Sequence, residues 1–363
     1  MPSTALIHDY LLVMRGAERT FRAMASCWPD APLYTLLFDP EGTEGCFAER
    51  SVRTSSLQRL GLRQGGFRPL LPFLPAAVEA LPVAGHDLIV TSTSAFAHGV
   101  WPAPGAVHVA YCHSPFRYAW HERERTLAES SPYLRPALAV ALERIRAWDV
   151  AASGRVTHYI ANSEITRERI REFYGRDASV IHPPVAVERF RPGVPEDFLL
   201  VVAELVPHKR IDFALEAARL AGRPIKVVGG GPELKRLERD YGDGAEFLGR
   251  VSDADLVDLY ARSLALVMPN VEEFGITAVE AQAAGRPVIA ADAGGARETV
   301  VPGETGVLVS PGSVDSLAEA MRETDFEAFS PSRIRAHAAR FSTEMFRERL
   351  RAEVDRLTGA ATP

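Results

Sequence analysis

The sequence predicts an α/β protein with two consecutive, doubly wound parallel sheets whose strand ends face a cleft. Short apolar runs alternate with helix-length segments along most of the 363 residues, a length that favours two domains over one. A stretch rich in Pro and Gly, residues 185–196, interrupts the alternation, which restarts at Phe198. We therefore place a first domain at residues 1–185 and a second at residues 186–340.

Composition favours a soluble protein that does not bind nucleic acid. Apolar residues make up 47% of the chain and charged residues 24%, and the net charge is -6. Cys27, Cys46 and Cys112 form no CxxC pair, so neither a disulfide framework nor a zinc site is predicted. The chain starts in an apolar strand without a basic leader, and no stretch approaches the ~20 apolar residues of a membrane span. We expect a cytoplasmic protein, at most peripheral on the inner face of the cell membrane.

Hydrophobic periodicity places the elements of both domains. In the first domain we expect strands at residues 4–8, 32–38, 87–91, 107–112, 155–162 and 178–182, and helices at residues 17–26, 134–150 and 164–174, the last capped by Ser163. In the second we expect strands at residues 198–203, 225–228, 245–248, 264–268, 287–291 and 306–309, and helices at residues 211–220, 233–241, 252–260 and from Gly275 to Gly285. After Val314 the chain is predicted to be helical. Residues 341–363 are expected to form a C-terminal helix that returns to the first domain, with one apolar face: Phe346, Leu350, Val354 and Leu357.

Two carboxylates, Glu272 and Glu280, stand eight positions apart around a predicted helix start. Two turns of helix rise about 11 Å, so one carboxylate before the helix and one inside it can reach two ends of an extended ligand. The helix N-terminus between them suits an anion. This segment either holds a nucleotide sugar or is one more α/β crossover.

His113 follows the predicted strand at residues 107–112, in a segment that also holds Arg117, Tyr118 and Trp120. Ligands of open parallel sheets bind at the carboxyl ends of the strands, and these side chains suit a sugar or a pyrophosphate. A structural histidine in a proline turn is the alternative. Gly16 lies at the first strand-to-helix turn, where it either lets backbone amides approach a phosphate or simply makes a tight turn.

Residues 50–78 combine five arginines with leucine and phenylalanine and hold no acidic residue. Such a mixture suits an anionic membrane surface or a lipid-linked phosphate, and an arginine-rich solvated face over an ordinary core is the alternative. Pro69, Pro72 and Pro75 exclude one long amphipathic helix. The arginines are Arg50, Arg53, Arg59, Arg63 and Arg68.

Two short motifs are set aside. The glycines at residues 229–231 lack the GxGxxG spacing of a dinucleotide-binding loop. Asp253 and Asp255 form a DxD pair, but acidic residues in the first turn of a helix are expected from the helix dipole alone. No metal ion or cofactor is therefore predicted.

The segment from Glu272 to Val288 resembles the E-x7-E signature of retaining GT-B glycosyltransferases of family 4. Further segments agree with that family in order and spacing: residues 16–19, 111–120, 161–163, 180–185, 205–212, 229–236 and 294–300. The chain is most similar to the branch typified by O-antigen mannosyltransferases of the WbaZ type, where the HDxL start and the YCHxPxRYAW segment recur. The resemblance implies the GT-B fold, with two Rossmann-like domains across a cleft.

The resemblance also implies roles for single residues. Glu280 would accept hydrogen bonds from the donor ribose, Glu272 would contact the transferred sugar, and Lys209 would neutralise the diphosphate. His113 would lie near the donor sugar from the other domain, so Glu272, His113 and Lys209 form the implied catalytic set. Other contacts to the donor would come from Gly16, Arg15, Arg210 and the backbone of Phe274, Gly275 and Ile276. The implied acceptor-binding residues are His113, Arg117, Tyr118 and Asn162.

Two positions depart from the family pattern. The family usually has an arginine five residues before the lysine, where this chain has Glu204, and a second glycine where it has Arg15. A carboxylate cannot bind a diphosphate directly. Arg210, Arg297 or Arg15 would have to supply the missing positive charge.

The resemblance implies a retaining transferase that moves a hexose, with mannose from GDP-mannose favoured. The acceptor would be a saccharide linked to polyprenyl diphosphate, in the assembly of a surface polysaccharide or O-antigen. Same-face attack with the leaving phosphate as base is the usual proposal for the family, so no protein nucleophile is required. The alternatives are transfer from a UDP-sugar, a non-catalytic nucleotide-sugar-binding subunit, and a sugar-nucleotide epimerase.

Overall fold

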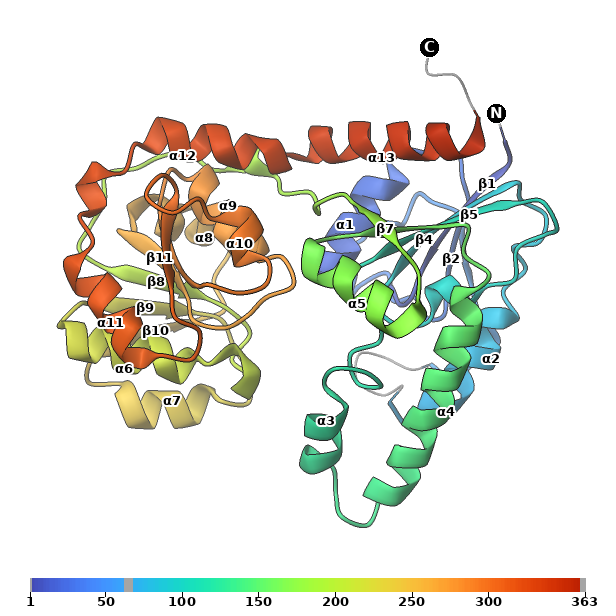
Figure 1. Cartoon of the computed structure of the whole chain (residues 1–363), viewed down its shortest axis with the longest axis horizontal. Coiled ribbons are helices and arrows are strands. Elements are labelled where there is room, and N and C mark those ends of the chain that lie inside the picture. Colours follow the sequence, from blue (N-terminus) through green and yellow to red (C-terminus); the bar gives the residue numbers. More distant parts are fainter. Residues whose placement is uncertain (1, 62–67, 360–363) are drawn as a thin grey trace. The chain divides into compact units, whose positions relative to one another are not determined.

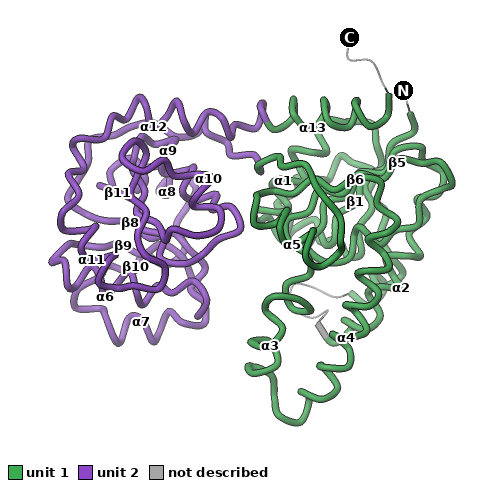
Figure 2. Tube along the Cα trace, viewed as in Figure 1, with its two compact units in different colours: residues 1–182, 346–363 green, residues 183–345 purple. Residues whose placement is uncertain are grey.

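The computed structural model describes residues 2–61 and 68–359, which form two compact units. Unit 1 comprises Met1–His182 and Phe346–Pro363, and unit 2 comprises Pro183–Met345 (Figure 2). Each unit is a parallel sheet with helices on both faces, so the prediction of two doubly wound, Rossmann-like domains is confirmed (Figure 1).

Unit 1 contains a seven-stranded parallel sheet with the order β3-β2-β1-β4-β5-β6-β7. Its strands are β1 (Thr4–His8), β2 (Leu33–Thr35), β3 (Val52–Thr54), β4 (Leu88–Thr93), β5 (Val107–Cys112), β6 (His158–Ala161) and β7 (Ala178–Val180). Its helices are α1 (Gly16–Ala25), α2 (Leu74–Glu79), α3 (Arg123–Glu129), α4 (Arg135–Ser153), α5 (Glu164–Tyr174) and α13 (Thr343–Thr358), with short 3-10 turns η1 (Ser56–Leu60), η2 (Arg68–Phe73) and η3 (Ala97–Gly99). The strand order reverses direction between β1 and β4, which makes this pair the topological switch point.

The core of unit 1 lies on both faces of this sheet, because successive residues of a strand point to opposite sides. Leu6 of β1 packs in one cluster with Phe21 of α1, whereas its neighbour Ile7 packs in a second cluster with Leu142 of α4. Helix α13 joins the first cluster with α1 (Figure 1). Its buried side chains are Phe346, Leu350 and Val354, with Leu357 partly buried.

Unit 2 contains a six-stranded parallel sheet with the order β10-β9-β8-β11-β12-β13. Its strands are β8 (Leu199–Val202), β9 (Ile225–Val228), β10 (Ala245–Gly249), β11 (Ala265–Met268), β12 (Val288–Ala291) and β13 (Gly306–Val309). Its helices are α6 (Ile211–Ala221), α7 (Leu234–Tyr241), α8 (Asp253–Arg262), α9 (Ile276–Ala283), α10 (Ala296–Thr299), α11 (Val314–Glu323) and α12 (Pro331–Ala338), with 3-10 turns η4 (Val187–Arg189), η5 (Pro207–Lys209), η6 (Phe326–Ala328) and η7 (Ala339–Phe341). Here the switch point lies between β8 and β11.

Three local predictions need correction. The strand predicted at residues 32–38 ends at Thr35, and beyond it Phe38 forms only an isolated parallel bridge with Leu11, while its N–H and carbonyl bond to the side-chain amide of Gln58. Ser163 stands at the N-cap of α5, but its hydroxyl donates to Asn162 and Thr166 instead of capping the helix. The strand β3 and the helices α2 and α3 have no counterpart in the predicted elements.

In the described parts of this segment, residues 50–61 and 68–78, the chain forms no long helix, in agreement with the positions of the prolines. The segment is divided among β3, η1, η2 and α2, and Pro72 lies inside η2. Arg63 and the side chain of Arg68 lie outside the described residues. In the part of the chain that the structure covers, no helix combines the length and the apolar character that crossing a membrane requires.

Candidate active site

Lys209 and Glu272 meet at the switch point of unit 2. Lys209 ends η5 after β8, and Glu272 follows β11, so the two strands that flank the switch point deliver an ammonium and a carboxylate to one place. Lys209 Nζ donates a hydrogen bond to Glu272 Oε1, and Asn270 Nδ2 donates to the same oxygen at 2.9 Å. Each of the paired side chains keeps 21% of its surface exposed, so both remain accessible to a ligand.

The start of α9 offers backbone amides beside this pair. Gly275 is the N-cap residue, with a φ of 89°, and a Cβ there would approach Met268 Sδ and Cε at 3.2 Å. Glycine therefore fits this turn better than any other residue. The Phe274 ring is buried against Phe341, so its backbone rather than its side chain is available near the helix start. The first amides of a helix lack intrahelical acceptors, and a helix N-terminus attracts anions. Ile276 is the first residue of α9, so its backbone amide is such a group.

The loop that follows β12 supports the same turn. Gly295 donates its N–H to the carbonyl of Glu272 at 2.9 Å. A Cβ on Gly295 would come within 2.2 Å of Phe274 Cα, so only glycine allows this approach. The motif at residues 294–300 thus holds the backbone around Glu272 in place.

Glu280 lies one turn further into α9 and is oriented by a buried tyrosine. The hydroxyl of Tyr260, on α8, donates to Glu280 Oε2 at 2.9 Å. Burial, together with the Glu280 charge, raises the pKa of Tyr260 well above its ordinary value, so its hydroxyl stays protonated and remains a donor. Glu280 itself is half-buried.

The two candidate replacement cations of unit 2 are engaged with neighbouring side chains. The Arg210 guanidinium stacks 3.4 Å over the Phe213 ring and pairs with Asp212 at 3.6 Å. Arg297 pairs with Asp292 at 2.8 Å. Glu204 is exposed in the loop after β8. Both arginine pairs are at least 30% exposed and therefore weak, so a polyphosphate can compete for either cation.

In unit 1, His113 follows β5 and is linked to the switch-point strands. Its Nε2 lies 2.9 Å from Ser92 Oγ, and Ser92 Oγ lies 3.0 Å from Nδ1 of His8. His8 is buried and stacks on Phe21 with ring centroids 4.9 Å apart. Burial, followed by the nearby His8, lowers the pKa of His113 to about 3, so its ring is neutral at physiological pH.

The loop after β1, where the sequence predicted a turn at Gly16, leads directly into helix α1. Gly16 begins α1, and Arg15 is the extended N-cap residue with an exposed side chain. The Arg15 N–H donates to Glu18 Oε2 at 3.0 Å, which fixes the entry to the helix. Glu18 also approaches His8, at 4.0 Å, so α1 and β1 meet near the histidine pair.

The predicted acceptor residues follow β5 and β6. Tyr118 is 43% exposed with its ring edge against Phe116, and Arg117 is half-buried. Asn162 is buried after β6, where its N–H donates to the carbonyl of Cys112 at 3.1 Å.

The Trp120 side chain packs against interior residues and does not contribute to a ligand-binding surface. Its ring stacks on Phe173 at 4.6 Å, and its Nε1 donates to the buried Asp149 at 2.6 Å. Asp149 also accepts from Tyr174 at 2.8 Å, and it lies 3.1 Å from His98. This network anchors the end of the loop that carries His113.

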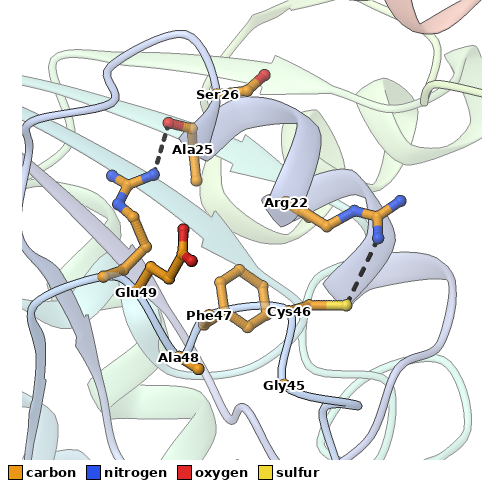
Figure 3. Close-up of a pocket in the computed structure, with 9 residues that line it drawn as sticks. Arg22, Ala25, Ser26, Gly45, Cys46, Phe47, Ala48 and Glu49 are labelled. Carbon is orange, nitrogen blue, oxygen red and sulfur yellow. Dashed lines mark hydrogen bonds between the residues drawn. The ribbon is translucent and has the colours of Figure 1, made fainter.

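A cavity of about 350 Å³ lies elsewhere in unit 1, between the C-terminal half of α1 and residues 45–50 (Figure 3). Arg22 donates to Cys46 Sγ there, and Arg50 donates to three carbonyls, those of Ala25, Trp28 and Ala31. None of the predicted site residues lines this cavity. Arg50 therefore belongs to the fold of unit 1 and not to a membrane-facing surface.

The DxD pair forms ordinary contacts at a helix start. Asp253 pairs with Arg189 at 2.7 Å, and Asp255 accepts from Ser252, the N-cap residue of α8. Across residues 2–61 and 68–359, no three His, Cys, Asp or Glu side chains gather as they would around a metal ion.

Three residues near the site carry no signal in the sequence: Ser92, Asn270 and Tyr260. Ser92 and Tyr260 act through partners distant in sequence, as Tyr260 does through Glu280, whereas Asn270 acts through Glu272 two positions later. Strand register supplies a signal for one pair, because His8 and Ser92 are direct neighbours on the paired strands β1 and β4. Without knowledge of which strands pair, that neighbour relation is not visible in the sequence.

The fold and the switch-point residues together define a GT-B protein. Two family models match the chain: Glycosyltransferase Family 4 over residues 14–189, and Glycosyl transferases group 1 over residues 187–324. The two models meet near the boundary between the units. Each model matches one of the two domains, and the two matches together support a GT-B glycosyltransferase of family 4.

Curated relatives match the chain over part of their length. A GDP-mannose-dependent monoacylated alpha-(1-6)-phosphatidylinositol monomannoside mannosyltransferase of Corynebacterium glutamicum is 33% identical over 226 residues, covering 52% of this chain and 59% of its own. A D-inositol 3-phosphate glycosyltransferase of Gordonia bronchialis is 33% identical over 222 residues, covering 50% and 48%. The chain thus spans about half the length of the curated relatives it matches.

Solved structures agree with the fold over nearly the whole chain. Sucrose-phosphate synthase from Thermosynechococcus elongatus matches with a TM-score of 0.74 at 19% identity, over 99% of both chains. Anabaena HepE in complex with UDP-glucose matches with a TM-score of 0.70 at 20% identity, over 97% of this chain and 99% of its own. At these identities the likeness concerns the fold alone.

Proposed function

We propose that this protein transfers a hexose from a nucleotide sugar to a saccharide acceptor and retains the anomeric configuration. The observation that carries the proposal is the convergence of Lys209, Asn270 and Glu272 at the switch point of unit 2, beside the start of α9. A cation and helix amides suit a diphosphate, and a carboxylate with an amide suits sugar hydroxyls.

Binding of the donor would exchange the Lys209–Glu272 bond for two bonds to the ligand. The ammonium of Lys209 would pair with the diphosphate, and Glu272 would accept from a hydroxyl of the transferred sugar. The bond between the anomeric carbon and the phosphate oxygen then breaks, which leaves negative charge on the diphosphate. Lys209 and the α9 amides stabilise that charge more strongly in the transition state than in the ground state.

Retention follows from attack on the same face as the leaving group. The acceptor oxygen forms the new bond to the anomeric carbon, and its proton passes to the departing phosphate oxygen. Because Glu272 accepts hydrogen bonds from Lys209 and Asn270, we assign it to a hydroxyl of the sugar and not to nucleophilic attack. The scheme needs no metal ion, since Lys209 and the helix amides supply the positive charge.

We propose GDP-mannose as the donor and a polyprenyl-diphosphate-linked saccharide as the acceptor, in the assembly of a surface polysaccharide or O-antigen. The GDP-mannose dependence of the Corynebacterium relative supports this donor. A UDP-sugar is the competing donor, because HepE is solved in complex with UDP-glucose. The resemblance of residues 111–120 to O-antigen transferases supports the acceptor class.

Contact with an anionic membrane surface forms part of the proposal, because a polyprenyl-linked acceptor lies at such a surface. Unit 1 exposes Phe73 by 61% and Leu60 by 57%, next to the exposed Arg59. The α3–α4 hairpin projects from the sheet of unit 1 and carries Tyr133, 94% exposed, and Leu134 at its tip (Figure 1). Between residues 130 and 142 the only charged residue is Arg135, so the tip combines apolar area with positive charge.

The test is a donor panel with radiolabelled GDP-mannose, UDP-glucose and UDP-N-acetylglucosamine, with a lipid-linked saccharide fraction as acceptor. We expect transfer from GDP-mannose, an α-linked product by NMR, and loss of transfer in Glu272→Ala. Absence of transfer from every donor, or a Glu272→Ala variant as active as the wild type, would refute the proposal. An inverted product would refute retention.

A binding subunit without transferase activity is the second candidate. The observation in its favour is that Glu204 replaces the usual arginine while Arg210 and Arg297 are paired with Asp212 and Asp292. Submicromolar GDP binding without turnover, with any acceptor supplied, would support this role. Conversion of the donor in the absence of an acceptor would instead identify an epimerase.

A further inference from the structure

Three polar side chains of unit 1 form a continuous hydrogen-bonded chain from the interior to His113. His8 ends β1 and Ser92 lies opposite it on β4, since the parallel register pairs the two residues directly. His113 follows β5, and its N–H donates to the carbonyl of Thr93 on β4 at 2.9 Å. Sheet register alone therefore brings His8, Ser92 and His113 together.

The direction of each hydrogen bond in this chain follows from its partners. His8 Nδ1 lies 3.1 Å from the backbone carbonyl of Ser92, and a carbonyl only accepts. His8 Nδ1 must therefore carry a hydrogen, which it shares with Ser92 Oγ at 3.0 Å. The Ser92 hydroxyl accepts from His8, and because Ser92 is buried with no other acceptor among the contacts of the described residues, its own hydrogen is donated to His113 Nε2 at 2.9 Å. His113 Nε2 is thus an acceptor.

A neutral imidazole carries one hydrogen, so a His113 ring that accepts at Nε2 carries its hydrogen on Nδ1. Burial and the nearby His8 hold the pKa of His113 at about 3, which keeps the ring in this neutral form. The surrounding groups are the edge of Tyr111 at 5.2 Å, the His8 ring at 6.5 Å and, beyond His8, the Glu18 carboxylate. None of them stands within hydrogen-bonding distance of Nδ1 among the contacts of the described residues.

The Asp9 carboxylate fixes the backbone next to Ser92. It accepts the N–H groups of Ser94 at 2.5 Å, Phe96 at 2.8 Å and Ala97 at 2.6 Å. His8 and Asp9 are adjacent. His8 holds the Ser92 side chain, and Asp9 holds the loop that follows β4. This rigidity keeps Ser92 in the one orientation that suits His113.

We propose that Ser92 and His8 are positioning residues that keep the His113 hydrogen on Nδ1, so that His113 donates from Nδ1 to an oxygen of a sugar ligand. The donation to the sugar rests on the proposed function, whereas the tautomer of His113 does not. A ring with its hydrogen on the other nitrogen would present a lone pair at Nδ1 and could only accept a hydrogen bond from a sugar hydroxyl. The Ser92 hydroxyl therefore selects for a ligand oxygen that accepts.

The first test measures the tautomer by NMR on the full chain with ¹⁵N-labelled histidine, with His113 assigned by its absence in His113→Gln. We expect the wild type to show the Nδ1–H tautomer alone from pH 5.5 to 8. Ser92→Ala should produce a mixture with the Nε2–H tautomer, and Ser92→Thr should keep the wild-type spectrum because it keeps the hydroxyl. Ser94→Ala, which removes a neighbouring hydroxyl, should change nothing. An Nε2–H ring in the wild type, or a Ser92→Ala spectrum identical to it, would overturn the proposal.

A second variant tests His8 without emptying its site. His8→Phe keeps the stacked ring on Phe21 but removes the donor, so Ser92 can turn its hydroxyl away from His113. We expect a mixture of the two His113 tautomers, as in Ser92→Ala. The folding control is the thermal midpoint of Ser92→Ala, which should equal that of the wild type. A pure Nδ1–H ring in His8→Phe would remove His8 from the proposal.

The third test separates positioning from the proposed function. Ser92→Ala should lower kcat/KM for transfer roughly tenfold, the effect of one hydrogen bond, and leave the Kd for GDP alone unchanged because GDP lacks the transferred sugar. Equal losses for GDP and for transfer would indicate a structural defect and contradict the proposal. If no donor is turned over, the proposed function fails while the NMR result still decides the tautomer.

Discussion

The ammonium of Lys209 donates to the carboxylate of Glu272, although 63 positions of chain separate the two residues. In the partly exposed site the two charges neutralise each other until a ligand binds both side chains. We expect Lys209→Ala to lower kcat by ~10²–10³, because one preorganised contact to a developing anion has that value. Initial rates at saturating donor measure this loss.

The control for that change is Lys226→Ala. Lys226 also pairs with a glutamate, Glu246 at 3.0 Å, but on the strands β9 and β10. We expect its kcat to remain within twofold of the wild type. Equal losses in the two variants would mean that the charge of unit 2, and not the position of Lys209, supports catalysis.

Glu280 should contribute to nucleotide affinity and not to the chemical step. Glu280→Gln removes a charged acceptor, and such hydrogen bonds are worth about 1.5–3 kcal/mol, so the Kd for GDP should rise about 10- to 100-fold. Tyr260→Phe should have a smaller effect because it only frees the Glu280 side chain. Isothermal titration with GDP measures both changes, and a Glu280→Gln variant that binds GDP normally would contradict the ribose role.

Asp149 should be a large contributor to the stability of unit 1. It is fully buried and accepts from Trp120 and Tyr174, so Asp149→Ala leaves buried donors without an acceptor. Removal of one partner from such a buried network costs about 3–5 kcal/mol. Urea unfolding followed by tryptophan fluorescence measures the loss. Asp177→Ala, which breaks exposed pairs with Arg167 and Arg171, should leave the transition nearly unchanged.

Acid should destabilise the protein below pH 6.5. Burial lowers the pKa of His108 and of His113 to about 3, whereas both rings titrate near 6.5 in the unfolded chain. Between these values the unfolded state binds two protons that the folded state does not, so the free energy of unfolding falls as the pH falls. The slope is about 1.4 kcal/mol per pH unit for each histidine. His108→Gln should lower this slope by about 1.4 kcal/mol per pH unit in urea titrations at pH 5, 6 and 7.5, and an unchanged slope would contradict the assignment.

The α3–α4 tip should mediate vesicle binding. We expect Tyr133→Ser combined with Leu134→Ser to reduce co-sedimentation with vesicles of phosphatidylglycerol and phosphatidylcholine severalfold. Val194→Ser is the matched control, since Val194 is an apolar side chain of unit 2 with 82% exposure. Equal sedimentation of the double variant and the wild type would remove the tip from the proposal. A double variant that instead alters the elution volume in size-exclusion chromatography would show that the tip is a self-association surface.

Local patterns predict the elements of this chain well, because parallel strands buried on both faces read as continuous apolar runs. The strands Thr4–His8 and Val107–Cys112 begin and end where the sequence places them. Side-chain contacts to the backbone are less visible. The Gln58 amide that bonds the backbone of Phe38 lies 20 positions away from it in the sequence and belongs to no pattern.

The same limit applies to the candidate site. Glu272, Glu280 and Lys209 stand out because motifs mark them, whereas Ser92 and Tyr260 act through pairings that only the folded chain creates. For Arg50 the sequence suggested a functional role where the structure shows a structural one. Its charge suggested a surface role, yet its guanidinium binds three carbonyls around the end of α1, an arrangement that composition cannot reveal.

Helix α13 has a consequence for synthesis of the protein. Unit 1 takes its last buried side chains, Phe346, Leu350 and Val354, from beyond unit 2 in the sequence. On the ribosome, unit 2 is therefore complete before the first unit can close its core, which reverses the usual N-terminal-first order of domain folding. Until α13 emerges, the apolar face around Phe21 and Tyr111 stays uncovered, and a nascent chain paused before residue 346 would be a substrate for chaperones.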